Sequence, residues 1–248
     1  DGSTDGSLDI LREYAAEDNR IQIIEQKNAG AGAARNNGMR HATGKYLSFL
    51  DSDDFFEPRM LEKAYDLAEK DQADFVAYKS DQYHTEKKQF VSADWVIHEN
   101  EIPPYHPFNH RQMTGNVFKV FVGWAWDKLF LKEFVDKHHL TFQEQRTSND
   151  LLFVFSAVVL AKKISVQRRD AKDSLSKTRE YSWDCFYRAL MALRDRLREE
   201  GLYEELERDY INYALHFSLW NYNTLSEPTK TKLKDKLRGE WFRELGVE

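Results

Sequence analysis

The stretch Leu47-Ser48-Phe49-Leu50-Asp51-Ser52-Asp53-Asp54 passes from an apolar segment directly into three carboxylates. The apolar part predicts a buried β-strand, and a strand that ends here presents the side chains that follow it at the edge of a sheet. Carboxylate oxygens are the ligands that Mg²⁺ and Mn²⁺ prefer, so Asp51 and Asp53 are candidate ligands of one divalent cation. The alternative is a polar turn in which Ser52 or Asp54 caps the helix that follows.

Helical and extended patterns alternate ahead of this stretch. The pattern predicts a helix over 8–15, a short strand over 21–24 and a second helix over 33–39, with turn-forming residues between them. Such an order indicates parallel strands joined by helical crossovers, and ligands of these sheets bind at the carboxyl ends of the strands. Asp1 and Asp51 both fall at such ends, so the sequence predicts an α/β fold with a site there.

The remainder of the chain continues the mixture of helices and strands. The patterns predict a helix over 58–70, a buried strand over 75–78, hairpin strands near Tyr83 and over 90–96, a loop over 101–107, a helix from Leu151, and three helices over 183–199, 203–222 and 228–245. The charged, serine-rich segment 162–180 lacks periodicity, and we interpret it as an exposed connector.

Composition narrows the class of partner. The chain has 248 residues, a formal net charge of −6 and a sequence pI of about 5.8. Nucleic-acid binding depends on clustered cations, so nucleic acid is not expected as a partner. Cys185 is the single cysteine, which excludes an intrachain disulfide and fits a reducing compartment such as the cytoplasm. No apolar run approaches the ~20 residues of a membrane span.

Aromatic residues cluster between 117 and 134, and we interpret most of them as core. Two of them, Trp124 and Trp126, are candidates for a different role. Sugars present flat C–H faces that stack on aromatic rings, while their hydroxyls bond to polar groups. We therefore expect these two indoles to contact a sugar acceptor.

Several motifs occur in a defined order. Residues 1–7 are similar to the second half of an Asp-Asp-Gly-Ser-Thr-Asp-Gly-Ser signature, 28–36 to an Asn-x-Gly-x-x-x-Ala-Arg-Asn block, and 51–53 to an Asp-x-Asp metal motif. Segments 126–130 and 149–153 are similar to Trp-x-Lys-Leu-Phe and Glu-Asp-x-x-Phe segments. Together they resemble glycosyltransferase family 2, whose catalytic domain has the GT-A fold, and in particular its bacterial polysaccharide members.

The resemblance implies a domain organisation. Residues 1–165 are expected to form a GT-A-like, mostly parallel sheet with helices on both faces, and residues 166–248 a linker and a C-terminal helical extension. In the family, a strand–helix–strand unit and one more Asp precede the position of Asp1. We therefore expect the sheet and the nucleotide site of this chain to be incomplete at the amino terminus.

The resemblance also assigns roles to residues. It implies an inverting transfer of a sugar from a nucleoside-diphosphate donor, with UDP expected, to a saccharide or lipid-linked acceptor. Asp150 would be the general base, although it is also a candidate N-cap of the helix from Leu151. The remaining roles comprise donor contacts by Asp1, Arg35, Asn36, Asp51 and Asp53, of which the last two hold Mn²⁺ or Mg²⁺, and acceptor contacts by Lys128 and Asn149, the latter replacing the Glu of the family.

Location and assembly follow from the same resemblance. We expect a cytoplasmic enzyme of bacterial polysaccharide biosynthesis that attaches peripherally to the inner face of the membrane. Self-association through the C-terminal helices is a further expectation.

Two other functions remain open from the sequence. Gly30 and Gly32 lie between a predicted strand and helix, with Asp51 about 20 residues further on, which partly matches the dinucleotide fingerprint of oxidoreductases. Arg35, however, stands where that fingerprint has its third glycine. The other alternative is a non-catalytic interaction module that has lost nucleotide binding.

Overall fold

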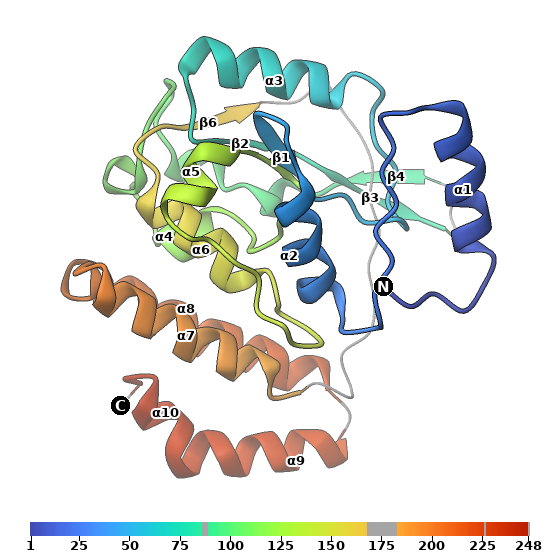
Figure 1. Ribbon diagram of the computed structural model, residues 1–248. Coiled ribbons are helices and arrows are strands. Elements are labelled where there is room, and N and C mark those ends of the chain that lie inside the picture. Colours follow the sequence, from blue (N-terminus) through green and yellow to red (C-terminus); the bar gives the residue numbers. More distant parts are fainter. Residues whose placement is uncertain (86–88, 168–182, 226, 248) are drawn as a thin grey trace.

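The computed structural model describes residues 1–85, 89–167, 183–225 and 227–247. An α/β unit occupies the upper part of Figure 1, and the C-terminal helices lie beneath it. Most of the connector predicted over 162–180 lies outside the described residues. None of the helices in the described ranges combines the length and the apolarity that crossing a membrane requires.

The central sheet is mixed. Its strands follow the order β1 (Tyr46–Ser48), β5 (Lys128–Leu131), β2 (Phe75–Tyr78) and β6 (Ile164–Gln167). β5 is antiparallel to both neighbours, whereas β2 and β6 are parallel. Three of the four strands therefore run in one direction, and their carboxyl ends meet at the same edge of the sheet.

Two strand predictions were wrong. The segment 21–24 has no regular structure, because no described strand lies beside it to accept its backbone hydrogen bonds. β6 was assigned to the exposed connector, but Ile164 and Val166 are buried and Ser165 Oγ donates to Asp71 Oδ2 at 2.6 Å. Flanking charges conceal this strand in the sequence, and its position shows that the α/β unit continues slightly beyond residue 165.

The two faces of the sheet are covered by different helices. Alternate side chains point to opposite faces of a strand, and Val76 and Tyr78 pack with Ala64 and Ala68 of α3 (Met60–Asp71). Phe75, Ala77 and Phe130 belong instead to the large core on the other face. That core contains α4 (Val117–Val120) and α6 (Leu151–Leu160), so the sheet lies between two helical layers (Figure 1).

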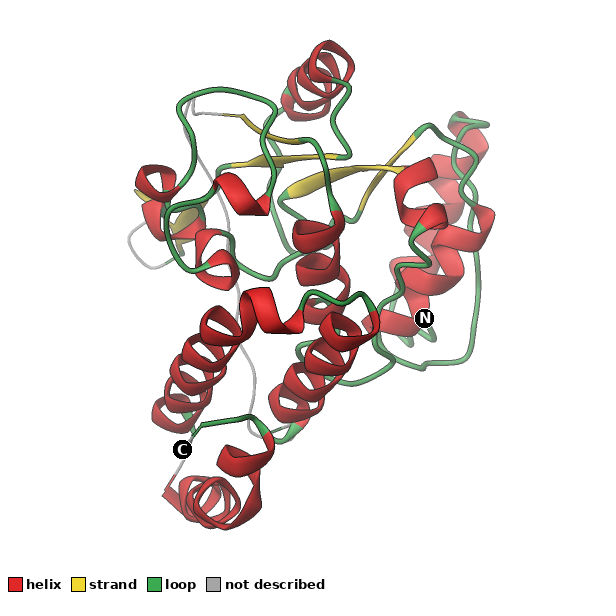
Figure 2. Ribbon diagram, turned by 90° about the vertical axis from the view of Figure 1, so that its left-hand side faces the viewer, coloured by secondary structure: helices red, strands yellow, loops and turns green. Residues whose placement is uncertain are grey.

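The three C-terminal helices are confirmed. They comprise α7 (Cys185–Glu199), α8 (Tyr203–Thr224) and a last helix built from α9 (Glu227–Lys236), a π-helical turn (Leu237–Trp241) and α10 (Phe242–Glu244). Figure 2 shows them as a layer apart from the strands. The core is nevertheless continuous, because the Tyr213 ring lies 6.0 Å from Phe118 and 5.0 Å from Phe155.

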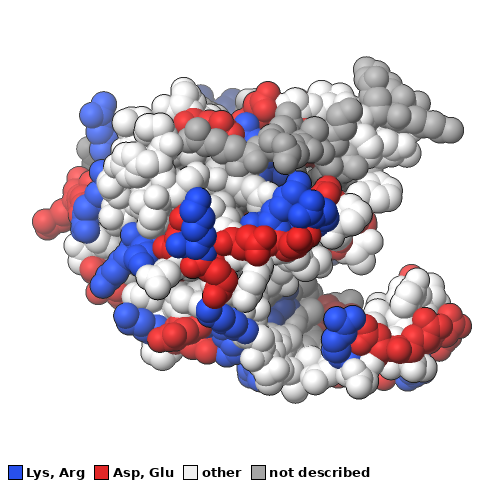
Figure 3. Space-filling view, turned by 90° about the horizontal axis from the view of Figure 1, so that it is seen from above, with Lys and Arg blue, Asp and Glu red and all other residues white. Residues whose placement is uncertain are grey.

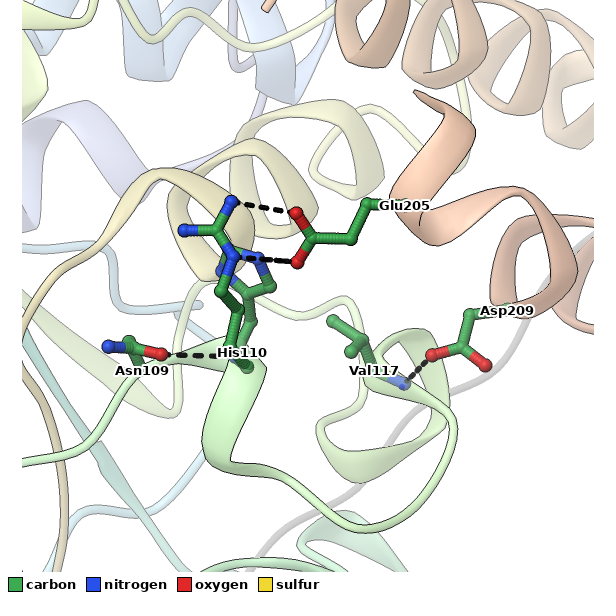
Figure 4. A network of polar contacts seen from close by, with 6 residues as sticks. Asn109, His110, Val117, Glu205 and Asp209 are labelled. Atoms are coloured by element: carbon green, nitrogen blue, oxygen red, sulfur yellow. Dashed lines mark hydrogen bonds and ion pairs between the residues drawn. The ribbon is translucent and has the colours of Figure 1, made fainter. Parts of the chain in front are cut away.

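Polar contacts also fasten α8 to the α/β unit (Figure 4). Arg111 Nε and Nη2 donate to the Glu205 carboxylate at 2.7 Å each, and Val117 N donates to Asp209 Oδ2 at 3.1 Å. His110 is buried beside this pair, and burial lowers the pKa of its imidazole. A two-bonded ion pair at Glu205 and a backbone bond to Asp209 hold one geometry, so they fix α8 relative to the α/β unit.

The remaining elements lie around this framework. They are α1 (Ser7–Glu17), α2 (Ala31–His41), the hairpin β3 (Asp81–His84) and β4 (Gln89–Ser92), α5 (Lys132–Lys137), and short 3₁₀ helices at Asp94–Val96, Glu99–Glu101 and His110–Gln112. The hairpin was predicted, but its second strand, expected over 90–96, ends at Ser92 and is followed by the 3₁₀ helix Asp94–Val96. α1 buries none of its residues, and its Ile10, Leu11 and Tyr14 are exposed.

Charge is mixed on the surface that includes α3, which lies at the top of Figure 1. Figure 3 looks onto this side and shows cations and anions interspersed. The ion pair of Lys45 with Glu69 and that of Arg59 with Glu62 belong to this region. Both pairs are substantially exposed, so they contribute solubility more than stability.

Candidate functional site

The carboxyl edge of the sheet gathers side chains from distant parts of the chain. Asp51 follows β1, and Tyr78 ends β2 on the same edge. The Tyr78 hydroxyl lies 3.5 Å from Ser48 Oγ and donates to Trp126 O at 3.0 Å. The end of β1 and the loop that carries the predicted acceptor-binding indoles are therefore adjacent.

Arg35 lies at the centre of this edge. Its Nη2 donates to Asp51 Oδ1 at 2.5 Å, and its Nη1 donates to Asn149 Oδ1 at 2.9 Å. The guanidinium also lies 5.4 Å from the centre of the Phe142 ring, and the side chain is only 16% exposed. A guanidinium is planar and always charged, and it can bond to two partners at once. Here Arg35 joins α2, the end of β1 and the start of α6.

Two glycines allow α2 to pack closely against the 141–150 loop. Gly30 adopts φ +90°, a conformation that side chains rarely allow, where the loop turns into α2. A Cβ on Gly32 would lie 2.1 Å from Gln143 O, so the helix can press against the 141–150 loop only with glycine there. Gly30 and Gly32, which partly matched a dinucleotide fingerprint, thus allow α2 to place Arg35.

Asp150 is the residue before α6 and makes no capping bond with its side chain, so the N-cap alternative is not observed. Burial raises the pKa of this carboxyl from 3.8 to about 6. The positive charge of Arg35 opposes the rise and the negative charge of Asp51 adds to it. A carboxylate with a pKa close to neutral pH is suited to accept a proton during a reaction.

Asp51 and Asp53 offer oxygen atoms at the same edge. Asp53 is exposed, and the bond from Arg35 uses only Oδ1 of Asp51. Hard oxygen donors that retain open positions fit a divalent cation whose remaining ligands are phosphates and water. Within the described part of the chain, no three His, Cys, Asp or Glu side chains converge on a metal position.

The polar-turn alternative for this stretch is partly observed. Asp54 N donates to Asp51 O at 3.3 Å, which closes a turn. The helix after it, α3, begins at Met60 with Arg59 as its N-cap, so neither Ser52 nor Asp54 caps it. The turn is therefore present, but the side chains of Ser52 and Asp54 are not used to cap α3.

Asp1 is engaged by the loop that precedes α2. Its Oδ1 accepts from Gln26 Nε2 at 2.7 Å and from Ala29 N at 2.9 Å, and its Oδ2 accepts from Gly30 N at 3.0 Å. The carboxylate therefore holds the Gly30 loop. Contact with a nucleobase, the role that the resemblance implies, stays a prediction.

Asn36 differs from its predicted role in the donor pocket. The residue is 8% exposed, its Nδ2 donates to Phe142 O at 2.9 Å, and its Oδ1 accepts from Phe142 N at 2.8 Å. Both ends of the amide are thus occupied by one backbone unit. Asn36 fastens α2 to the 141–150 loop, and that contact places Arg35 beside Asn149.

Replacing Asn36 with Ala should lower the free energy of unfolding by about 2 kcal/mol, because two buried backbone groups of Phe142 lose their partners. Urea denaturation measures the change. The exposed Asn19 provides the control, and Asn19→Ala should stay within about 0.5 kcal/mol of the unsubstituted chain. Weaker UDP binding at unchanged stability would instead support direct contact with a donor.

Lys128 and Asn149, which the resemblance assigns to the acceptor, are both buried and bonded within the chain. The Lys128 side chain is 1% exposed, and its Nζ donates to Val122 O at 3.1 Å, to Trp124 O at 2.8 Å and to Asp127 Oδ1 at 2.6 Å. Asn149 is 8% exposed and binds Arg35. Through its bonds to Val122 O and Trp124 O, Lys128 holds the loop that carries the indoles. Asn149 orients the guanidinium of Arg35.

The two predicted indoles lie together. The rings of Trp124 and Trp126 are stacked, with centroids 5.1 Å apart and an interplanar angle of 22°. Sequence reasoning missed a third indole, Trp95, whose ring meets Trp124 edge to face at 5.4 Å. It also missed Phe142 and Tyr78, because nothing in the local pattern distinguishes these two from ordinary core residues.

The mixed sheet, with helices on both faces and carboxylates at its carboxyl edge, has the GT-A glycosyltransferase fold. The chain belongs to glycosyltransferase family 2, since the family model described as "Glycosyl transferase family 2" matches residues 1–137. The resemblance drawn from the motifs is therefore confirmed.

Curated relatives of the chain are named as glycosyltransferases. The chain is 28% identical over 249 aligned positions to the putative glycosyltransferase EpsH of Bacillus subtilis. This alignment covers 96% of the chain and 71% of EpsH. It spans smaller shares of other curated relatives, 63% and 48% in two cases.

Solved structures show the same fold. S. aureus TarS 1–349 in complex with UDP-GlcNAc matches with a TM-score of 0.68 at 18% identity, covering 98% of this chain and 68% of that one. The mannosyltransferase PcManGT from Pyrobaculum calidifontis, in complex with GDP-Man and Mn²⁺, matches with a TM-score of 0.52 at 12% identity, covering 99% and 72%. At these identities the likeness concerns the fold.

Proposed function

We propose that the chain transfers a sugar from a UDP donor to an acceptor hydroxyl with inversion at the anomeric carbon. The observation that carries the proposal is the contact of Arg35 with Asp51 and Asn149, which places the end of β1 beside Asp150. The UDP-GlcNAc complex of TarS, a protein of the same fold, supports a UDP-sugar as donor.

In the proposed reaction, the acceptor oxygen forms a bond to the anomeric carbon while the bond from that carbon to the diphosphate oxygen breaks. The electron pair of the broken bond stays on the diphosphate, and the acceptor proton passes to the Asp150 carboxylate. A pKa of about 6 leaves this carboxylate mostly ionised at pH 7 and still basic enough for the transfer. Attack from the side opposite to the diphosphate accounts for inversion.

Asp51 and Asp53 are the residues that would hold Mn²⁺ or Mg²⁺. When bound, the cation supplies positive charge that offsets the negative charge growing on the diphosphate. Arg35 orients the Asp51 carboxylate through Oδ1, so this ligand is already in place before a donor arrives. The Mn²⁺ complex of PcManGT, whose fold is similar, supports a divalent metal.

The acceptor side is proposed to use the stacked pair Trp124 and Trp126. The Tyr78 hydroxyl donates to Trp126 O, so the pair lies next to the carboxyl edge, which supports an acceptor surface on the side of Asp150. A saccharide or a lipid-linked saccharide suits such a surface. Participation in bacterial polysaccharide biosynthesis is proposed by analogy with the family.

Location and assembly are proposals of the same kind. The single cysteine, Cys185, is a buried free thiol, which supports a reducing, cytoplasmic environment. Leu219 and Trp220 are exposed on α8, as are Ile10, Leu11 and Tyr14 on α1. Exposed apolar side chains support peripheral contact with a membrane or with a second copy of the chain.

Isothermal titration of the chain with UDP, with and without MnCl₂, tests the proposal. We expect binding that is at least about tenfold tighter with Mn²⁺, because a cation held by Asp51 and Asp53 would offset the negative charge of the diphosphate. Titration with NAD in parallel should show no binding. Binding of NAD, or the absence of UDP binding in the presence of Mn²⁺, would overturn the assignment.

A further inference from the structure

A third indole, Trp95, adjoins the stacked pair formed by Trp124 and Trp126. It belongs to the 3₁₀ helix Asp94–Val96, whereas Trp124 and Trp126 belong to the loop before β5. The Trp95 ring is 46% exposed and meets Trp124 at 5.4 Å with an interplanar angle of 76°. An exposed indole held edge to face against a second one keeps a fixed orientation.

A hollow of about 350 Å³ lies beside Trp95. Its lining includes Lys79, Asp94, Trp95, His98, Glu99 and Asn100. This volume is at the lower end of the range for small-molecule sites, about 300–1,000 Å³. Its size suits one or two sugar rings, and it is too small for a folded partner.

The polar groups of the hollow favour a neutral ligand. Lys79 Nζ lies 2.8 Å from Glu99 Oε1 and 3.6 Å from Asp94 Oδ1, and its side chain is 11% exposed. The cation is thus already paired with two carboxylates, which would repel a phosphate or a sulfate. Carboxylate, imidazole and amide groups, in contrast, can each donate to or accept from sugar hydroxyls.

The segments that carry the hollow and the indoles lie side by side. His98 N donates to Val120 O at 3.0 Å, and Val122 N donates to Val96 O at 3.1 Å. Lys79 directly follows Tyr78, whose hydroxyl donates to Trp126 O. The three indoles are in contact one after another, with Trp126 against Trp124, Trp124 against Trp95, and Trp95 at the hollow.

We propose that Trp95 and this hollow form a second saccharide subsite, which holds a neutral sugar residue of the acceptor beyond the one that receives the transferred sugar. The acceptor is accordingly a glycan of at least two residues. This inference rests on the proposed glycosyl transfer, since it extends the acceptor side of that site. The outer sugar stacks on the Trp95 indole, and the polar groups of the hollow bind its hydroxyls.

A printed array of defined glycans, from monosaccharides to octasaccharides, provides the probe. The fluorescently labelled chain should bind neutral glycans of two or more residues, and Trp95→Ala should weaken this binding at least about tenfold, as loss of a central aromatic contact does. Trp95→Phe should retain most of it. Tyr65→Ala is the matched control, because Tyr65 is a similarly exposed aromatic on α3 whose ring also meets a neighbour, Tyr46, edge to face, and its loss should not matter.

Binding that survives Trp95→Ala, that is confined to monosaccharides or to anionic glycans, or that is absent would overturn the subsite. Near-UV circular dichroism and thermal melting show whether Trp95→Ala leaves the fold intact, as its exposure predicts. Titration with UDP and Mn²⁺ separates the two proposals. If UDP binds and glycans do not, the subsite alone is wrong. If glycans bind through Trp95 and UDP does not, a saccharide site at Trp95 stands, but its assignment to the acceptor of a transfer reaction is overturned.

Discussion

Asp150→Asn should lower turnover by at least about 100-fold, with affinity for UDP and Mn²⁺ nearly unchanged. An amide cannot accept the acceptor proton, and loss of a general base acts on the transition state more than on donor binding. Release of UDP from a UDP-sugar in the presence of an acceptor measures turnover, and calorimetry measures affinity. If turnover persists, another carboxylate is the base.

The matched control is Asp184→Asn. Asp184 also precedes a helix, α7, and also makes no capping bond with its side chain, but it lies in the C-terminal helical layer. Its replacement should leave turnover within about twofold, since surface changes away from a site have small effects. An equal loss in both variants would indicate a general effect on helix ends.

Asp150 should also make turnover and stability depend on pH in opposite ways. Turnover should rise as the pH increases through about 6, the pKa of the carboxyl, because only the ionised form accepts a proton. The free energy of unfolding should fall as the pH rises from about 4 to about 6, because Asp150 holds its proton more tightly in the folded chain than in the unfolded one. Above that window, Asp150→Asn should raise the free energy of unfolding of the metal-free chain by on the order of 2 kcal/mol.

Asp53→Asn should abolish the enhancement of UDP binding by Mn²⁺. A neutral carboxamide is a poorer ligand for a dication than a carboxylate, and Asp53 is exposed, so the fold should be unaffected. Calorimetry with UDP at fixed MnCl₂ checks the result against Asp66→Asn, an exposed carboxylate on α3. Full Mn²⁺ dependence in Asp53→Asn would remove Asp53 from the metal site.

Local pattern was sufficient for the elements that frame the site. The apolar run before Asp51 identified β1, and the 3.6-residue periodicity identified α3, α7 and α8, because these signals lie within one element. The same reasoning placed the carboxylates at a strand end. It failed at 21–24, where an apolar run has no described neighbour with which to pair, and at β6, where charged flanks hide a buried strand.

The sequence by itself determined the family, the strand that ends before Asp51, and the helices α3, α7 and α8. Tertiary structure alone decided which polar residues face that edge. Arg35 meets Asn149 across 114 positions of sequence, and no local periodicity reports such a contact. Asn36 and Lys128, which the resemblance assigns to the donor and the acceptor, are enclosed, and backbone groups of neighbouring segments supply most of their partners. Burial of this kind depends on how segments pack against one another, which is a property of the assembled chain.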